Sequence, residues 1–122
     1  MTYNSQNFGK NGEEEAVKFL KNLGYTIVET NWRARKLEID IIAKDVETLV
    51  VVEVKTRATD AFGDPETFVS KQKQNNLVKA ANEYIMQTDF NGETRFDIVS
   101  VLQINNNLVV KHIQNAFQPS II

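Results

Sequence analysis

Cysteine is absent from this 122-residue chain, and proline, glycine and histidine are scarce, with two, five and one residue respectively. Without cysteine, disulfides, thiolate zinc sites and cysteine nucleophiles are excluded, and a reducing compartment such as the cytoplasm is expected. The sequence holds no run of the roughly 18 apolar residues that a membrane-spanning helix needs, and its N-terminus lacks the apolar stretch of a signal peptide. We therefore expect a cytoplasmic protein with no membrane partner.

Two further absences narrow the chemistry. The single histidine, His112, sits in an apolar segment without an obvious partner, so a structural role is expected. A Ser-His-Asp triad would require this histidine, and the sequence contains no Gly-x-Ser-x-Gly turn. It also lacks the glycine-rich phosphate loops of P-loop and Rossmann proteins. Serine hydrolases and those nucleotide-binding classes are excluded.

Charge of either sign is not in large excess, because 14 basic and 16 acidic residues leave a net charge of -2. This balance argues against a protein that coats nucleic acid, since backbone affinity comes from neutralising phosphates. Many basic residues nevertheless lie in the middle of the chain: Arg33, Arg35, Lys36, Lys55, Arg57, Lys71, Lys73 and Lys79. On charge alone, a mixed solvated surface explains this distribution better than a binding face does.

Hydrophobic periodicity predicts one α/β domain over residues 11–122, preceded by a flexible polar leader at residues 1–10. Helical spacing begins at Gly12, places three glutamates in the first turn and ends at Gly24. Segments 26–32, 37–44 and 48–57 predict three strands in a meander, and a long amphipathic helix runs from about Ser70 to Gln87. Segments 95–104 and 108–117 predict two strands joined by a tight turn, so the order is αβββαββ.

The third predicted strand ends with two charges on one face. Side chains alternate across a sheet, so Glu53 and Lys55 point the same way as the apolar residues before them. A hairpin loop of even length, either 46–47 or 45–48, would set Asp40 opposite Glu53 and Glu38 opposite Lys55. Two facing carboxylates require either a cation between them or a raised pKa.

Mg²⁺ is the cation that such a pair favours, because it takes oxygen ligands and commonly uses one or two carboxylates with water and phosphate. Mn²⁺ fits the same ligands. Lys55 would then steer, or help to deprotonate, a water that attacks phosphorus. The alternative is a surface ion pair between Lys55 and Glu38 or Asp40, with Glu53 as an edge residue. The spacing on consecutive strands leaves these two interpretations about equal.

Residue-level motifs extend this pattern along the chain. They are Gly12-Glu13, Gly24-Tyr25, Asn31-Trp32-Arg33, Glu38-Ile39-Asp40, residues 52–57, Phe62-Gly63-Asp64-Pro65, Lys73-Gln74, Arg95-Phe96-Asp97 and Asn115-Ala116-Phe117. Together they resemble the PD-(D/E)xK nuclease superfamily, and more closely the small bacterial YraN family of predicted endonucleases, which is distantly similar to archaeal Holliday-junction resolvases. The resemblance runs from about Gly12 to Phe117. It departs at Leu37, where the family usually has glycine.

The resemblance implies a restriction-endonuclease-like core, with a central mixed sheet flanked by helices, and a Mg²⁺- or Mn²⁺-dependent endonuclease. Asp40 and Glu53 would bind the metal with the Val54 carbonyl and Glu13, and Lys55 would be the catalytic lysine. Any of the three glutamates at 13–15 could instead favour the positive helix N-terminus.

The implied nucleic-acid-binding residues are Arg33, Arg35, Lys36, Arg57, Lys73 and Gln74. DNA, including branched or structured DNA, is the implied substrate, and a homodimer is the implied assembly. A non-catalytic nucleic-acid-binding module with the same fold is the alternative. Trp32 would either stack on a base or lie in the core, and an aromatic residue in a strand favours the core.

Overall fold

The computed structural model describes the backbone of residues 5–58 and 69–119, with side chains from residue 11 onward. Its elements are α1 (Ser5–Asn22), β1 (Thr26–Ala34), β2 (Leu37–Asp45), β3 (Thr48–Arg57), α2 (Lys71–Thr88), β4 (Thr94–Ile104) and β5 (Asn107–Ile113). The predicted order αβββαββ is confirmed. The motif at residues 62–65 lies outside the described residues.

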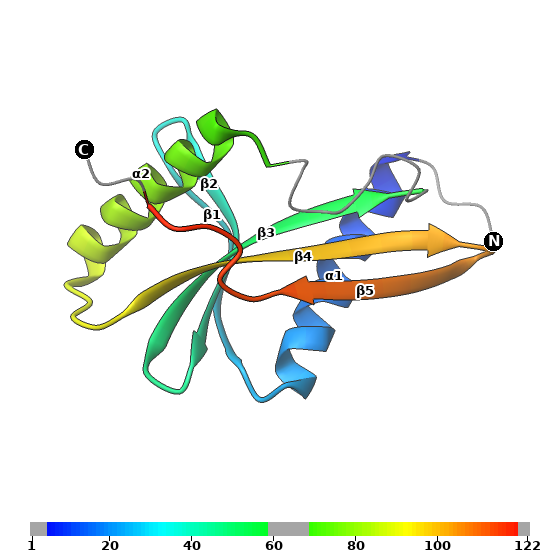
Figure 1. The fold of residues 1–122 in the computed structure, drawn as a ribbon, viewed down its shortest axis with the longest axis horizontal. Coiled ribbons are helices and arrows are strands. Elements are labelled where there is room, and N and C mark those ends of the chain that lie inside the picture. The colour runs from blue at the N-terminus through cyan, green and yellow to red at the C-terminus, as the bar shows by residue number, and fades with distance from the viewer. Residues whose placement is uncertain (1–4, 59–68, 120–122) are drawn as a thin grey trace.

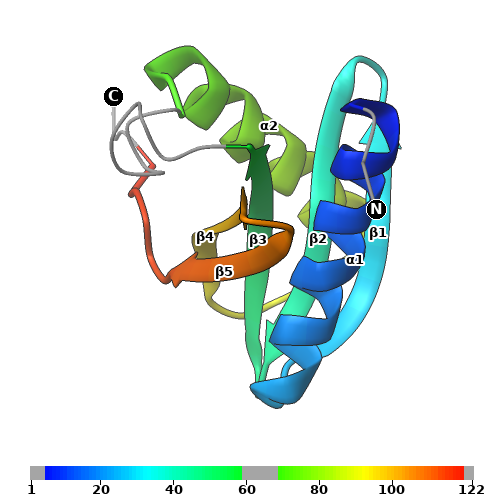
Figure 2. The ribbon, with the colours of Figure 1, turned by 90° about the vertical axis from the view of Figure 1, so that its right-hand side faces the viewer.

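The strands form one five-stranded sheet in the order β1-β2-β3-β4-β5 (Figure 1). β3 and β4 are parallel because α2 carries the chain back between them, and the other neighbours are antiparallel. The sheet is strongly twisted, so that β5 runs across the direction of β1 and β2 in Figure 2. This mixed α/β architecture is consistent with a restriction-endonuclease-like core.

Each face of the sheet has its own hydrophobic cluster, because β3 is apolar on both sides. Val50 and Val52 point toward α1 and pack with Ala16 and Leu20. Leu49 and Val51 point toward α2, whose buried residues are Leu77, Ala80, Ala81 and Tyr84. The two helices therefore cover opposite faces, as Figures 1 and 2 show, and β3 is the central strand that the sequence predicts.

α1 begins earlier than the periodicity indicates. It starts at Ser5, so Glu13 to Glu15 lie inside the helix and no acidic residue occupies its first turn. The prediction that the three glutamates lie in the first turn is therefore wrong, and the positive helix N-terminus does not explain them. The other end is as predicted: Gly24 adopts φ 94°. The amides of Gly24 and Tyr25 then bond to the carbonyls of Lys21 and Leu20 and close the last turn.

Gly12 allows α1 to lie close against β3. A Cβ placed on Gly12 would collide with the Thr56 Cγ2 methyl, and Val101 Cβ is 3.8 Å away. Glycine costs about 1 kcal/mol relative to alanine inside a helix, so its presence here reflects the close contact. Because Thr56 lies near the C-terminal end of β3, the contact places the next residue, Glu13, near that end of the strand.

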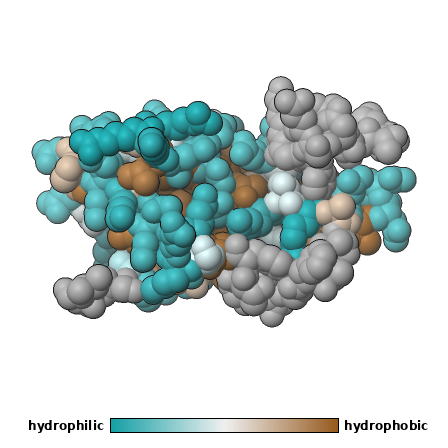
Figure 3. All heavy atoms as spheres, turned by 90° about the horizontal axis from the view of Figure 1, so that it is seen from above, coloured by the Kyte–Doolittle hydropathy of each residue, from teal (hydrophilic) through white to brown (hydrophobic). Residues whose placement is uncertain are grey.

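None of the described helices is long and apolar enough to cross a membrane. Seen from above, the surface is mostly hydrophilic and its hydrophobic residues form small separate areas (Figure 3). Such a surface is typical of a face in contact with water.

The β2–β3 turn contains a strained residue. Asp45 pairs with Thr48, so the loop is 46–47, one of the two even lengths expected. Val46 in this loop has φ 56° and is 88% exposed. A β-branched residue is disfavoured in the left-handed region, and no burial compensates for it here. By contrast, Asn105 and Asn106 have positive φ in the β4–β5 turn, where asparagine tolerates it.

Val46→Gly is expected to stabilise the protein by about 1 kcal/mol, because glycine adopts positive φ without the Cβ clash. Thermal denaturation should show a melting temperature higher by about 4 °C. Val28 is a control, being an exposed valine on β1 without positive φ, and Val28→Gly should lower the melting temperature. Equal shifts in both variants would contradict strain at Val46.

Candidate functional site

β2 and β3 separate where the predicted carboxylates lie. Their backbone pairing runs from Asp45 and Thr48 to Ile41 and Val52, which confirms the expected register. Beyond that point Asp40 Oδ2 accepts a hydrogen bond of 2.8 Å from the Val54 backbone amide. A carboxylate thus takes the place of the main-chain acceptor that β2 would have supplied. The side chain of Asp40 occupies the gap between the strands.

The strand is irregular around Asp40. Ile41 packs in the cluster on the α1 side, whereas Ile39 packs with Ile42 on the α2 side. Strict alternation would place Ile39 on the same face as Ile41. On β1, Asn31 lies between the residues paired with Ile39 and Ile41 and has φ 52°. This local twist directs Asp40 out of the regular face pattern.

Glu53 is a buried carboxylate between two lysines. Its side chain faces α2 and is 7% exposed, and its Oε1 lies 3.7 Å from Lys73 Nζ and 4.0 Å from Lys55 Nζ. Burial raises the pKa of Glu53, the negative charge of Asp40 raises it further, and the two lysines lower it, leaving a pKa of about 7. The lysines therefore compensate only part of the cost of burying this charge.

Asp40 also has a raised pKa. Burial raises its pKa despite the Val54 hydrogen bond, and the charges of Glu13 and Glu38 act in the same direction. Glu13 is half-buried and lines a cavity together with Asp40. Glu14 lines the same cavity but is exposed and is not among the charges that raise the pKa of Asp40, and Glu15 pairs with Lys18 at 3.6 Å. Of the three glutamates, Glu13 is the one directed toward Asp40.

The donor set fits a divalent cation held by two carboxylates. Asp40 and Glu53 both offer carboxylate oxygen atoms as ligands. Burial destabilises the charged form of each carboxylate, and a bound cation would offset this destabilisation. Among residues 11–58 and 69–119, no three Asp, Glu or His side chains are arranged to hold one ion between them. Mg²⁺ commonly uses one or two carboxylates and completes its shell with water and phosphate. Glu13 is therefore placed beside the pair and not at ligand distance with it.

The expected contact between Glu38 and Lys55 is not present. Glu38 forms its ion pair with Arg33 across the β1–β2 hairpin, at 3.7 Å, and Lys55 pairs with Glu53 on its own strand. The cause is the separation of β2 from β3 beyond Ile41, which moves Glu38 away from β3. The surface ion pair that competed with the metal interpretation is thus excluded as an explanation of Lys55.

Residues 12–101 match the model of a family described as "Uncharacterised protein family UPF0102". A UPF0102 protein of Flavobacterium psychrophilum is 48% identical over 109 residues, covering 89% of this chain and 92% of the relative. Relatives from Christiangramia forsetii and Persephonella marina are 45% and 44% identical over similar shares, 89% of this chain and 92% and 91% of their own lengths. The chain belongs to the UPF0102 family. The resemblance to the YraN family is thereby confirmed.

The basic residues expected to bind nucleic acid lie in two places in this UPF0102 protein. Arg33, Arg35 and Lys36 are exposed at the tip of the β1–β2 hairpin, where they line a cavity of about 180 Å³. Arg57 ends β3 and is partly buried. Lys73, on the first turn of α2, reaches Glu53.

Gln74 and the aromatic residues have structural contacts. The Gln74 side chain donates to the Val69 carbonyl at 3.1 Å, so Lys73 and not Gln74 is the residue of this pair that contacts Glu53. Trp32 packs edge-on against Tyr84 in the α2-side cluster, which favours the core interpretation. Leu37, the position at which the resemblance departs, packs against the same cluster.

His112 has a partner that the sequence did not reveal. Its Nε2 lies 2.8 Å from Asp97 Oδ2, and Asp97 is 1% exposed. Arg95 donates from Nε and from one terminal nitrogen to the same carboxylate, at 2.9 and 3.0 Å, and the Asn115 amide donates at 3.0 Å. The expected structural role of His112 thus follows from a buried network. The signal was Arg95-Phe96-Asp97, whose charges share one strand face.

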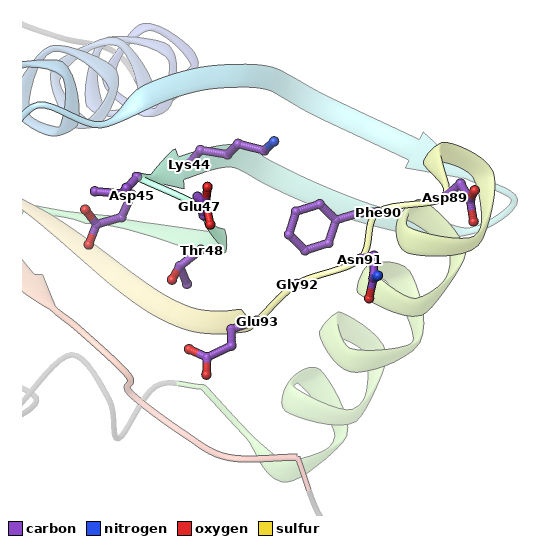
Figure 4. Close-up of a pocket in the computed structure, with 10 residues that line it drawn as sticks. Lys44, Asp45, Glu47, Thr48, Asp89, Phe90, Asn91, Gly92 and Glu93 are labelled. Carbon is purple, nitrogen blue, oxygen red and sulfur yellow. The ribbon is translucent and has the colours of Figure 1, made fainter.

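Another cavity, whose lining residues Figure 4 shows, does not include the carboxylate pair. It has a volume of about 970 Å³ and is lined by the β2–β3 turn and by the segment from Asp89 to Glu93. The Lys44 ammonium there lies 5.3 Å from the centre of the Phe90 ring. This cavity is at the opposite end of β3 from Glu53, so it is separate from the carboxylate pair.

Proposed function

We propose that this UPF0102 protein is an endonuclease that hydrolyses phosphodiester bonds in DNA with Mg²⁺ or Mn²⁺ bound by Asp40 and Glu53. The observation that carries the proposal is the placement of the buried Glu53 and the half-buried Asp40 at the opening between β2 and β3, both with raised pKa. Lysines alone leave Glu53 with a pKa of about 7, whereas a divalent cation would stabilise both charged forms.

The protein groups around the pair have separate roles. The metal would supply a Lewis acid that polarises the phosphate. Asp40 is held in place by the Val54 amide, so its free oxygen keeps one orientation. Lys55 and Lys73 place ammonium groups on either side of Glu53, where they would compensate the charge that builds up on phosphate oxygens. Hydrolysis joins the water oxygen to phosphorus and breaks the bond to the leaving sugar oxygen.

DNA is the proposed partner, met in the cytoplasm. Arg33, Arg35 and Lys36 project from the hairpin that leads into Asp40, and would contact phosphates flanking the reacting one. Arg57, at the end of β3, would extend this row of phosphate contacts. The Val54 carbonyl as a further ligand and assembly as a homodimer remain proposals by analogy with resolvases.

The experiment is a metal titration followed by a cleavage panel. Saturating Mg²⁺ should raise the melting temperature, since binding at a hundred times the dissociation constant stabilises by about 2.7 kcal/mol. Asp40→Asn should remove this rise and also abolish cleavage of linear, flapped and four-way DNA. Glu47→Gln is the matched control, because Glu47 is an exposed carboxylate in the β2–β3 turn. A wild-type protein that shows neither the rise nor cleavage would refute the proposal.

A non-catalytic nucleic-acid-binding module is the second candidate. It is favoured by the ion pairs of Glu53 with Lys55 and Lys73, which give the carboxylate a purely structural use. In that case DNA binding would weaken with salt but would be unaffected by a chelator and by Lys55→Ala. Binding measurements with a chelator and with Lys55→Ala thus distinguish the two functions.

A further inference from the structure

We propose that the cavity between α1 and β1 receives an unpaired nucleobase of the DNA substrate. The cavity has a volume of about 510 Å³, and its walls come from α1, β1 and β2. Figure 2 shows α1 running alongside β1 and β2. The inference rests on the proposed function, because it identifies the class of DNA that the same site accepts.

The position of the cavity connects it to the carboxylate pair. Asp40 and Glu13 line it at one end, and Asp40 is also the residue that bridges to Val54. A nucleotide seated in the cavity would therefore bring its own phosphate next to the proposed metal ligand. This places the base and the reacting phosphate within one nucleotide of each other.

The cavity walls match the chemistry of a nucleobase. Val17 and Ile41 provide an aliphatic surface that suits the flat faces of the ring. Thr30 and Asn31 line the β1 side with a hydroxyl and an amide, which suit the polar edge of a base. The walls thus combine apolar area with a few polar groups, as is usual for small-ligand sites.

The charges at the two ends also fit a nucleotide chain. Acidic residues lie at the end where a metal would bind, and the exposed amines of Lys18 and Lys21 lie along α1 toward the other end. The ion pair of Lys18 with Glu15 is at the surface and is weak, so the amine can turn to a phosphate. The lysines would bind the phosphate on the far side of the base.

A base inside a duplex cannot reach such a cavity without leaving its stack. Unstacking and unpairing cost a few kcal/mol, and the cost is smallest for a base that is already unpaired. The substrate class is therefore DNA with an unpaired nucleotide, at a bulge, a flap or a branch.

A binding comparison tests the inference. The probes are two labelled DNAs of equal length, a fully paired duplex and a duplex with one bulged nucleotide, measured with Ca²⁺, which takes the same oxygen ligands as Mg²⁺. Wild-type protein should bind the bulged DNA about tenfold more tightly. Thr30→Trp should remove this preference by filling the cavity, so that the bulged DNA binds no more tightly than the paired duplex.

Val28→Trp is the matched control. Val28 is 40% exposed on the same strand and does not line the cavity, so this variant should bind both DNAs as the wild type does. Both variants should fold, because aromatic residues favour strands. Equal affinity of the wild type for the two DNAs, or an unchanged preference in Thr30→Trp, would overturn the inference. The Mg²⁺-dependent rise in melting temperature would still report separately on the metal site.

Discussion

Replacing Glu53 by glutamine is expected to stabilise the metal-free protein and to abolish its response to Mg²⁺. Glu53 is 5% exposed and its pKa is raised to about 7 from an ordinary 4.5. The folded state thus favours the protonated form, and stability should fall as the pH rises from about 4.5 to about 7. Glutamine carries no charge at any pH, so the variant avoids this loss. At pH 8 it should be more stable by about 1–3 kcal/mol.

Urea denaturation at pH 5 and pH 8 without metal measures the first effect. The gap between variant and wild type should be small at pH 5 and should widen at pH 8. Adding Mg²⁺ at pH 8 should stabilise the wild type alone, and any cleavage activity should fall at least 100-fold in the variant. Glu47→Gln, at an exposed carboxylate, should match the wild type in both assays. A Glu53→Gln protein that is less stable at pH 8 would show that the lysine ion pairs outweigh burial.

Removing the Asp97 carboxylate is expected to have the largest effect on stability. Asp97 is buried and binds Arg95, His112 and the Asn115 amide. Arg95 also donates to Asp45 Oδ2 at 3.1 Å and to the Tyr25 hydroxyl at 2.6 Å. Asp97→Ala would leave the Arg95 charge without its main partner. Breaking one side of a buried ion pair costs about 3–5 kcal/mol, a large part of a typical domain's stability.

Comparing the free energy of unfolding of Asp97→Ala with that of Asp45→Ala separates the effect of the buried network from that of a surface ion pair. Asp45 is 36% exposed and contacts only the outer part of Arg95, so its loss should cost less than about 1 kcal/mol. If Asp97→Ala does not fold, Asp97→Asn, which keeps the shape of the side chain, replaces it. Equal costs for the Asp97 and Asp45 variants would contradict a buried network.

The pH dependence of the same variants gives a second reading. Burial would raise the pKa of Asp97, but hydrogen bonds from His112, Arg95 and Asn115 outweigh it and hold the pKa below its ordinary value. Its stabilisation is therefore complete above that ordinary value and is lost as the pH falls through the lower folded value. The wild type should lose stability on acidification more steeply than Asp97→Asn.

Local pattern was enough to predict the elements of the fold. Period-2 apolar segments and β-branched residues indicated all five strands. The N-cap of α2 is Ser70 and its C-cap is Asp89, so the helix begins and ends close to the expected residues. The start of α1 was misplaced because residues before Gly12 carry few apolar side chains, so periodicity has no signal there. An existing helix gains one backbone hydrogen bond for each residue that continues it, and this continuation reaches Ser5.

The proximity of Asp40, Glu53 and Lys55 was predictable from the sequence, but their individual contacts were not. Spacing and hairpin length brought Asp40 near Glu53 and placed Lys55 beside it, and the structure agrees. The bridge from Asp40 to Val54 depends on the separation of β2 from β3, which no local pattern encodes. The choice of Glu13 over its two neighbours depends on how α1 is rotated against the sheet, and Gly12 controls that contact.

The sequence by itself determined the order of elements, the face of β3 that carries Glu53 and Lys55, and membership of the UPF0102 family. These follow from periodicities and motifs that act over a few residues. Only the tertiary structure decided three contacts. Lys73 and Lys55 both pair with Glu53, Glu38 pairs with Arg33, and His112 forms a hydrogen bond with Asp97. Each of these contacts joins separate elements, or depends on where two strands diverge, so it exists only after the sheet has twisted and the helices have packed.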